Sequence, residues 1–169
     1  FLDHRVPAHD PRLEGVYSHF RQNLTDICGA AVRAGAKTIV CTVGTNLKDN
    51  PPFASVHREG MTRAERSGWE DLYQAGVRLA EEGRYGRAIE QFLDASGLDD
   101  RFAELHFRLG RCYGALGQFD RARERFVRAR DLDALRFRAD TGINRAIREV
   151  AGGREAQGIY LVDAEQAFE

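Results

Sequence analysis

A polar loop, residues 44–60, holds the side chains of this 169-residue chain that are best suited to chemistry. It follows a β-branched run that predicts a strand, and ligands bind at the carboxyl ends of strands in open α/β sheets. Asn46 could therefore donate a hydrogen bond to an oxyanion, and His57 could make a polar contact at the rim of such a site. The alternative, which we prefer, is that Asn46 and Asp49 form only turn hydrogen bonds and that the adjacent prolines stiffen the loop.

No complete catalytic apparatus accompanies this loop. Ser55 and His57 are too close together, in too open a segment, to serve as a nucleophile and its base. Four residues near the start have the side-chain types of metal ligands: Asp3, His4, His9 and Asp10. Their spacing matches no zinc signature, so a solvated tail is expected instead. We therefore expect no catalytic residue, metal or cofactor in this chain, and leave open whether its parent protein is an enzyme.

Composition and charge limit the classes of partner. The chain has 25 Lys and Arg against 26 Asp and Glu, a net charge of −1, which argues against a dedicated nucleic-acid or membrane surface. Asp120, Glu124 and Asp131 lie among and beside the arginines of residues 121–130, which predicts a solvated helix face with ion pairs. Cys28, Cys41 and Cys112 stand in apolar contexts without paired spacing, so we expect three buried free thiols and lean towards a cytoplasmic location.

The segment after the loop contains one pattern twice, with an offset of 34 residues. The first copy is Ala75, Gly76, Leu79, Gly83, Ala88, Phe92 and Ala95. The second copy is Leu109, Gly110, Tyr113, Gly117, Ala122, Phe126 and Ala129. Apolar residues recur at intervals of three and four within 69–82 and 85–96, so each segment predicts an amphipathic helix. A glycine follows the first helix of each pair, where the backbone must turn.

This period and this order of small and large residues resemble the tetratricopeptide repeat, a helix–turn–helix unit that stacks into a solenoid. The resemblance implies two stacked helical hairpins that bind other proteins rather than perform catalysis. In that family the first helix of each unit lines the concave face. The matching positions are Glu70, Tyr73, Gln74, Val77, Glu104, Phe107, Arg108 and Arg111.

Five of these positions form the candidate partner groove: Tyr73, Val77, Phe107, Arg108 and Arg111. Tyr73 and Phe107 would supply stacking or apolar anchors, while the two arginines would bind a carboxylate or an acidic peptide. The alternative is that the groove packs against the rest of the chain, with the helix after residue 135 as its cap, because two repeats are fewer than usually make a stable superhelix. The expected partner is thus a protein or peptide, or the rest of the parent chain.

Outside the repeats the pattern changes to a helix followed by a strand. Residues 13–34 predict a helix, and the continuous β-branched run 38–43 predicts a strand buried on both faces. Near the other end, residues 143–150 predict a helix and residues 159–162 a second buried strand. This order is typical of an α/β sheet with right-handed crossovers, in which the repeats occupy the excursion between the two strands.

These flanks are similar to part of an SGNH (GDSL-type) hydrolase. The similar runs are residues 16–24, 34–40, 143–150 and 159–163. The resemblance implies a flavodoxin-like sheet that carries an esterase or acyl-transfer site of Ser, His and Asp. The chain has no Gly-Asp-Ser stretch for the family's nucleophile and no Asp-x-x-His near its end. Asp99, Asp100 and Asp163 are therefore not assignable to such a site.

These observations predict a mainly α chain: two tetratricopeptide helix–turn–helix repeats plus a capping helix, inserted in a partial α/β, flavodoxin-like portion with two short parallel strands. The expected segments are 1–60, with a helix, a strand and a loop; 61–135, the repeats; and 136–169, with a capping or crossover helix, the second strand and the start of a further segment. We interpret the chain as a piece of a larger protein that recognises a protein or an intramolecular surface. The alternative is a fragment of an SGNH-type hydrolase whose catalytic groups lie outside this chain.

Overall fold

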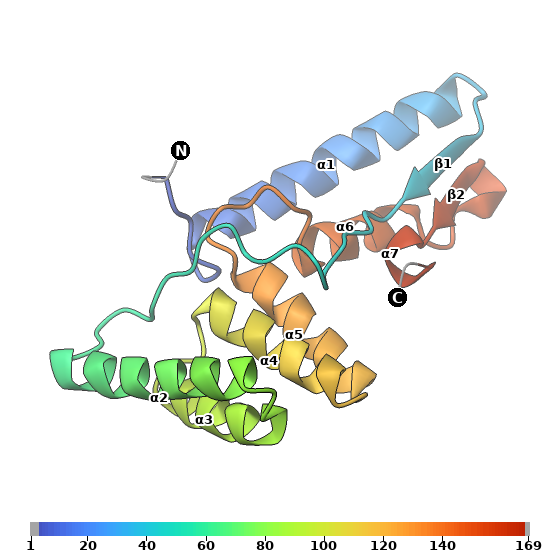
Figure 1. The fold of residues 1–169 in the computed structure, drawn as a ribbon. Coiled ribbons are helices and arrows are strands. Elements are labelled where there is room, and N and C mark those ends of the chain that lie inside the picture. Colours follow the sequence, from blue (N-terminus) through green and yellow to red (C-terminus); the bar gives the residue numbers. More distant parts are fainter. Residues whose placement is uncertain (1–3, 168–169) are drawn as a thin grey trace. The chain divides into compact units, whose positions relative to one another are not determined.

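The computed structural model describes residues 4–167, which are mainly helical with two short strands in one sheet (Figure 1). In chain order the elements are α1 (Arg12–Arg33), β1 (Thr38–Cys41), α2 (Arg63–Glu81), α3 (Tyr85–Leu98), α4 (Ala103–Ala115), α5 (Phe119–Leu132), α6 (Thr141–Ala151), a 3-10 turn (Glu155–Gln157), β2 (Ile159–Val162) and α7 (Ala164–Ala167). The predicted fold class, mainly α with helical hairpins and two short parallel strands, is confirmed.

These elements form two compact units. The first, the repeat unit, contains residues 4–8 and 46–135; the second, the sheet unit, contains residues 9–45 and 136–167. Most of the loop after β1, from residue 46 onwards, lies in the repeat unit. None of the helices in the described part of the chain is long and apolar enough to cross a membrane.

Two helical hairpins, α2 with α3 and α4 with α5, build the repeat unit. In each hairpin a glycine of the first helix lies against a phenylalanine of the second. A Cβ atom on Gly76 would lie 2.6 Å from the ring of Phe92, and one on Gly110 would lie 2.6 Å from the ring of Phe126. Only a residue without a side chain permits this close approach, and one apolar cluster continues from α2 to α5.

The hairpin helices begin and end at residues with specific backbone roles. Thr62 accepts a hydrogen bond from Glu65 N, and the Glu65 carboxylate accepts one from Thr62 N at 2.7 Å, which completes a capping box before α2. The helices α2 and α4 are followed by Gly83 and Gly117, with φ of 74° and 71°. This left-handed conformation favours glycine and lets the chain reverse into the second helix of each hairpin.

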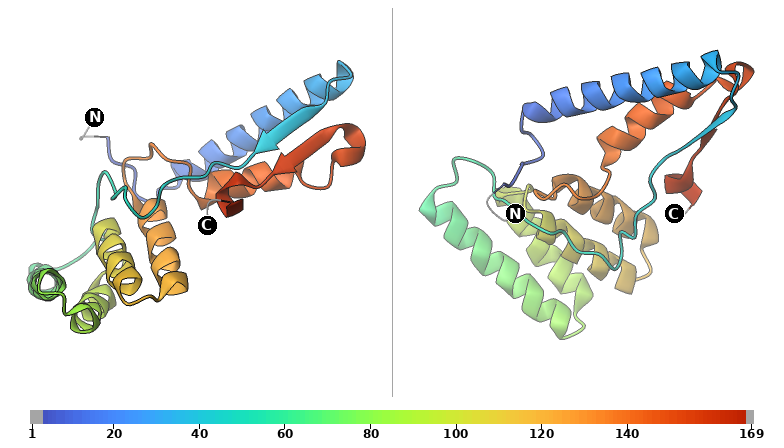
Figure 2. Two further views of the ribbon diagram at one scale, coloured as in Figure 1. Left: turned by 45° about the vertical axis from the view of Figure 1, so that its right-hand side comes forward. Right: turned by 90° about the horizontal axis from the view of Figure 1, so that it is seen from above.

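The sheet unit pairs β1 with β2 in parallel, with Thr38 opposite Ile159 (Figure 2). The helix α6 packs against both strands and against α1. The contact with α1 is close, because a Cβ atom on Gly142 would lie 2.7 Å from the ring of Tyr17. The helix α6, for which we expected a capping or crossover role, thus packs against the strands within the sheet unit.

The expectation that both strands are buried on two faces is wrong. Val40 and Ile159 pack with the helices in one apolar cluster, whereas Ile39 is 68% exposed and Tyr160 is also exposed. The reason is that α1 and α6 contribute to the same cluster on one face, and no helix of the described sheet unit covers the other. Alternate side chains of each strand therefore remain accessible.

The three cysteines are free thiols. Cys28 and Cys112 are buried as predicted, and burial raises the pKa of the Cys112 thiol to about 11. Cys41 is exposed, because it lies on the face of β1 that no described helix of the sheet unit covers. The prediction of a buried thiol is therefore wrong at this position.

Candidate functional site

The face expected to bind a partner lies on the first helices of the two hairpins, α2 and α4. Arg108 Nε donates to the Tyr73 hydroxyl at 2.8 Å, and the guanidinium carbon lies 5.7 Å from the centre of the tyrosine ring. Glu104, one turn earlier on α4, forms an ion pair with the same nitrogen at 3.1 Å. The phenol of one repeat and the carboxylate of the next thus orient Arg108.

The two aromatic residues of the candidate groove are core side chains. Tyr73 is 8% exposed and stacks on Trp69, with 4.8 Å between the ring centres. Phe107 is 6% exposed, and its ring centre lies 5.5 Å from that of Phe126. This differs from the expectation of exposed anchors, because both rings fill the apolar cluster of the hairpins.

The other three groove residues are more accessible. Val77 is half-buried at the edge of the apolar cluster, Arg108 is partly exposed and Arg111 is exposed. Among the described residues, no hydrogen bond or ion pair engages the Arg111 side chain, and no hydrogen bond engages the Nη atoms of Arg108. The groove therefore presents two guanidinium groups, one turn apart on α4, that are available to an anion.

Burial changes the acid–base behaviour of this face. Desolvation raises the pKa of the Glu104 carboxyl group, and the charge of Arg108 opposes part of that rise. Desolvation also raises the pKa of the Tyr73 phenol, so it stays neutral and keeps accepting from Arg108. The arginines keep their charge across the physiological range, because a guanidinium group does not lose its proton in proteins.

The loop residue Asn46 takes part in a local turn of the repeat unit. Asp49 N donates to Asn46 Oδ1 at 3.0 Å, and Asn46 Nδ2 donates to Asp49 Oδ2 at 3.1 Å. These are the turn hydrogen bonds of the alternative interpretation, and they engage both ends of the Asn46 amide. The role of Asn46 as an oxyanion donor stays a prediction.

The second loop residue, His57, lies in the aromatic core rather than at an open rim. Its Nδ1 atom is 2.8 Å from Asp99 Oδ2, and its ring packs edge-on against Trp69 with 4.6 Å between centres. Ser55 instead accepts a hydrogen bond from Glu104 N at 2.9 Å. No hydroxyl group in residues 4–167 is hydrogen-bonded to His57, so the His57–Asp99 pair has no nucleophile to activate there.

Asp99 is the residue of this loop site that sequence reasoning missed. It is 1% exposed and lies at the end of α3, in the repeats rather than in the loop. The repeat period carried a usable signal, because Asp133 stands 34 residues later at the end of α5 and is buried as well. A buried aspartate at the same position of both repeats indicates a shared hydrogen-bonding role.

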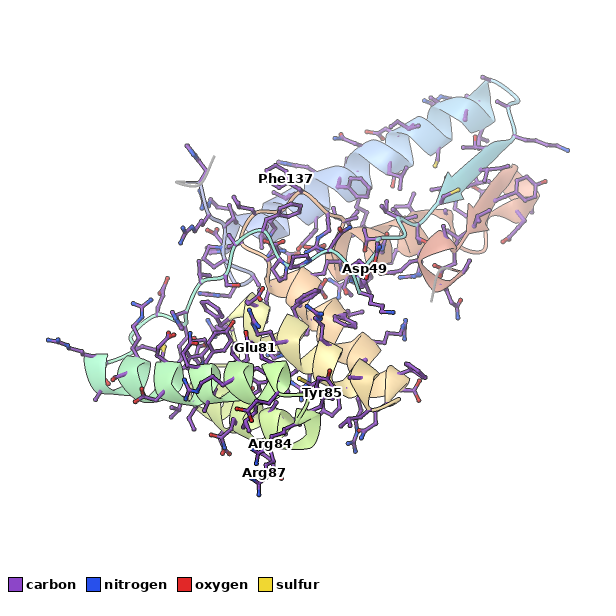
Figure 3. All side chains as sticks on the ribbon, in the orientation of Figure 1. Asp49, Glu81, Arg84, Tyr85, Arg87 and Phe137 are labelled. Carbon is purple, nitrogen blue, oxygen red and sulfur yellow. The ribbon has the colours of Figure 1, made fainter. Side chains whose placement is uncertain are left out.

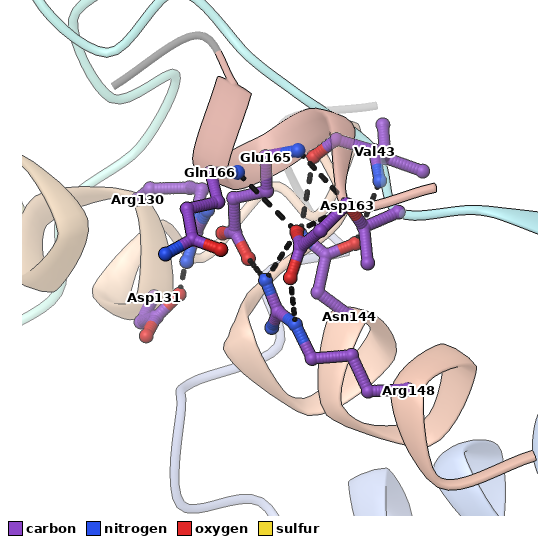
Figure 4. Close-up of polar contacts among 9 residues, drawn as sticks. Val43, Arg130, Asp131, Asn144, Arg148, Asp163, Glu165 and Gln166 are labelled. Carbon is purple, nitrogen blue, oxygen red and sulfur yellow. Dashed lines mark hydrogen bonds and ion pairs between the residues drawn. The ribbon is translucent and has the colours of Figure 1, made fainter. Parts of the chain in front are cut away.

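A separate polar cluster lies after the carboxyl ends of both strands in the sheet unit (Figure 4). Arg148 on α6 donates Nε to Asp163 Oδ2 at 2.7 Å and Nη2 to Asp163 Oδ1 at 2.8 Å, and Thr42 Oγ1 donates to the same Oδ1 at 2.8 Å. The Arg148 hydrogen bonds are the chief reason that the pKa of Asp163 lies well below its usual range. Both oxygens of Asp163 are thus engaged in tying the strand ends to α6.

Metal ligation has no support in the described geometry. Within residues 4–167 no group of three or more His, Cys, Asp or Glu side chains is placed to hold a metal ion. Of the four tail residues considered as ligands, Asp3 lies outside the described residues. Asp10 accepts from Arg12 N and Nε at 2.9 Å each, and the Arg12 hydrogen bond lowers the pKa of Asp10 to about 2.

Comparison with known proteins bears on the hairpins. A family model described as tetratricopeptide repeat matches residues 79–139, from the end of α2 through α5. Residues 79–139 are thus similar to tetratricopeptide repeats. Domains built from such repeats typically bind proteins or peptides. No curated protein and no solved structure matches the chain, and the hydrolase resemblance of the flanks finds no support in these comparisons.

Proposed function

We propose that the tetratricopeptide repeats bind an acidic segment of a protein or peptide through Arg108 and Arg111, with Val77 as an apolar contact. The observation that carries this proposal is the orientation of Arg108 by Tyr73 and Glu104. A guanidinium group that is already held in place loses less conformational entropy when it binds a carboxylate.

The two arginines suit an acidic ligand better than a purely apolar one. They lie three residues apart on α4, so both guanidinium groups project near one face of the helix. Tyr73 and Phe107 support this face from beneath rather than contacting the partner directly, because both are buried. The proposed groove is therefore a charged surface that lies over buried aromatic side chains.

The test is fluorescence anisotropy with a fluorescein-labelled peptide of alternating Glu, Gly and Leu, added to the whole chain. The double variant Arg108→Ala with Arg111→Ala is expected to bind the peptide about tenfold or more weakly. This loss of affinity corresponds to the binding free energy of one or two charge-assisted hydrogen bonds. The matched control is Arg87→Ala on α3, an exposed arginine that points away from the hairpin (Figure 3). Equal affinities for all three proteins, or equal binding of a Lys-containing version of the peptide, would refute the proposal.

The second candidate function is a part in a larger SGNH-type hydrolase, with the repeats as an insert. The parallel pairing of β1 and β2 with α6 as the crossover favours it, because this is the architecture of an α/β sheet. Asp163 is engaged by Arg148 and Thr42, so in this proposal the catalytic groups lie outside the chain. Hydrolysis of p-nitrophenyl acetate by a longer natural form, lost on substitution of its candidate serine, would support this role.

A further inference from the structure

The two repeats carry the same buried carboxylate at the same place. Asp99 follows α3 and Asp133 follows α5, and both are nearly inaccessible to solvent. Each carboxylate accepts a backbone hydrogen bond from the residue two positions later, Arg101 N at 2.9 Å and Leu135 N at 3.1 Å. These local bonds fix the carboxylates at the turns that follow the second helix of each repeat.

Both carboxylates also bind the backbone of a distant segment, residues 53–58, which we call the strap. At the second repeat, Asp133 Oδ2 accepts from Phe53 N at 2.9 Å and Asp133 Oδ1 accepts from Ala54 N at 3.0 Å. The strap completes this contact with its own carbonyl group, because Ala54 O accepts from Ala134 N at 2.9 Å. The second repeat therefore binds two N–H groups and one carbonyl group of the strap backbone.

The first repeat engages the strap in a related way, four residues further along. Asp99 Oδ2 accepts from Arg58 N at 3.2 Å and lies 2.8 Å from His57 Nδ1. Arg58 Nε also donates to Leu98 O at 2.9 Å. The strap thus advances from Ala54 to Arg58 between equivalent positions of consecutive repeats.

Between these two points the strap caps α4. The N-cap residue of that helix, Phe102, supplies no side-chain hydrogen bond, and Ser55 Oγ instead accepts from Glu104 N. Figure 2 shows this part of the chain passing the ends of α4 and α5 without forming a helix or strand of its own. A backbone donor at the start of α4 is thereby satisfied by a residue of another segment.

We propose that the edge formed by Asp99 and Asp133 is a second peptide-binding surface, specific for a non-helical peptide and occupied in cis by the strap. The recognition is carried by backbone N–H groups that bind buried carboxylates, with a register of four residues per repeat. Specificity comes from a serine that caps α4 and from a histidine that fits beside Trp69. This surface uses neither Arg108 nor Arg111, so it is separate from the groove proposed above.

The carboxylates rather than the shape of the edge are the decisive groups. Each has both oxygens engaged by N–H donors, whereas an asparagine amide has one accepting oxygen and presents an NH2 group at the other position. Replacement of Asp by Asn therefore keeps the side-chain volume but places the amide NH2 group opposite a backbone N–H donor. The exposed Asp120 on α5 provides a matched Asp→Asn control.

The first test is amide hydrogen exchange of the whole chain. The amides of Phe53, Ala54 and Arg58 should exchange at least tenfold more slowly than that of Val56, which has no hydrogen-bond acceptor among the described residues. Asp133→Asn should remove this difference at Phe53 and Ala54, while Asp120→Asn should leave it unchanged. Equal exchange of all strap amides in the unmodified chain would overturn the proposal.

The second test asks whether the edge binds the strap sequence in trans. In the whole chain, Ala54→Pro with Arg58→Pro removes two amide donors and should release the strap. A fluorescein-labelled peptide of residues 50–61 should then bind at least tenfold more tightly than it binds the unmodified chain, whose edge is already filled. The same peptide N-methylated at the positions of Ala54 and Arg58 should bind at least tenfold more weakly.

The fold of the released chain is checked by far-ultraviolet circular dichroism, and the single variant Ala54→Pro replaces the double variant if the latter does not fold. Binding that is indifferent to N-methylation, or no binding to a folded released chain, would contradict the proposal. The measured binding of the strap peptide does not depend on Arg108 or Arg111. The two proposals can therefore fail independently.

Discussion

At the scale of single residues, the contacts of Gly76 with Phe92 and of Gly110 with Phe126 set the spacing of each hairpin. A methyl group at either glycine would overlap an aromatic ring that is itself packed in the core. The ring cannot move without leaving a void, since protein interiors are close-packed. Gly76 and Gly110 are thus required by packing and not by turn geometry.

We expect Gly76→Ala to lower the free energy of unfolding by roughly 1–3 kcal/mol through overpacking. The matched control is Gly68→Ala on the same helix, where the added Cβ would be 3.8 Å from Leu98 Cδ1, an ordinary contact. That control should gain up to ~1 kcal/mol from helix propensity. Urea denaturation followed by the fluorescence of Trp69, the single tryptophan, measures both. Similar midpoints for the two variants would show that the glycine contact has no energetic role.

His106 is a buried titratable residue of the repeat unit. It is 0% exposed, its Nε2 atom lies 2.7 Å from Asp100 O, and Arg125 and Arg128 are its nearest cationic neighbours. Desolvation lowers the pKa of its imidazole from 6.5 to about 4, and the hydrogen bond to the Asp100 carbonyl group opposes that shift. The folded chain therefore holds His106 neutral at pH values where the unfolded chain protonates it.

Because the folded pKa is the lower one, His106 contributes stability that is present above pH 6.5 and is lost as the pH falls towards 4. The loss is on the order of 3 kcal/mol, since each pKa unit corresponds to ~1.4 kcal/mol. We expect His106→Gln, which cannot titrate, to flatten the stability profile over this interval, whereas His19→Gln at an exposed position should not. Parallel profiles for His106→Gln and the unmodified chain, from urea denaturation at several pH values, would rule out this linkage.

At the scale of elements, the start of the loop after β1 is held to α6 by one side chain. Asn144 is fully buried, and its amide accepts from Val43 N at 2.8 Å and donates to Val43 O at 3.0 Å. These two hydrogen bonds resemble those between neighbouring β-strands, and they lie just after the end of β1. Arg148 and Asp163 tie the end of β2 to the same helix, so α6 organises both strand ends.

We expect Asn144→Ala to destabilise the chain by about 1–3 kcal/mol, because it leaves a donor and an acceptor of Val43 without their partners. Hydrogen exchange at the Val43 amide should also become faster. The control is Asn23→Ala, an exposed position of α1 where the change should have little effect. Thermal unfolding followed by circular dichroism gives the stability, and unchanged exchange at Val43 would contradict the assignment.

At the scale of the whole molecule, the polar groups considered as catalytic candidates are engaged in structural contacts. His57 is paired with Asp99, Ser55 caps α4, and Asp163 is bound by Arg148. In the described residues these groups do not form a nucleophile, base and orienting acid within hydrogen-bond reach of one another. These groups thus make structural contacts within the unit to which each belongs.

We therefore expect this chain to hydrolyse p-nitrophenyl acetate no faster than an equal concentration of free imidazole accounts for, because no hydroxyl group is activated by His57. The control is His57→Ala, which should not change the rate beyond the loss of one imidazole. A rate well above the imidazole background that disappears in His57→Ala, measured by release of nitrophenolate, would contradict this expectation.

Much of the fold follows from periodicity in the sequence. The small residues at Gly76 and Gly110, with the phenylalanines of the second helices, predict two hairpins at their observed places. The runs 38–43 and 159–162 likewise predict two parallel strands. These features are recognisable because helices, turns and strands depend mainly on residues close in sequence.

The candidate site was less predictable, because its properties depend on which distant segments meet. The sequence by itself determined the two hairpins, the strand pair and the positions of Arg108 and Arg111 on one helix. Only the tertiary structure decided that Tyr73 and Phe107 are buried, that the strands have one exposed face, and that Asp99 binds His57. The physical reason is that burial and hydrogen bonding belong to pairs of segments, whereas a periodic pattern describes one segment at a time.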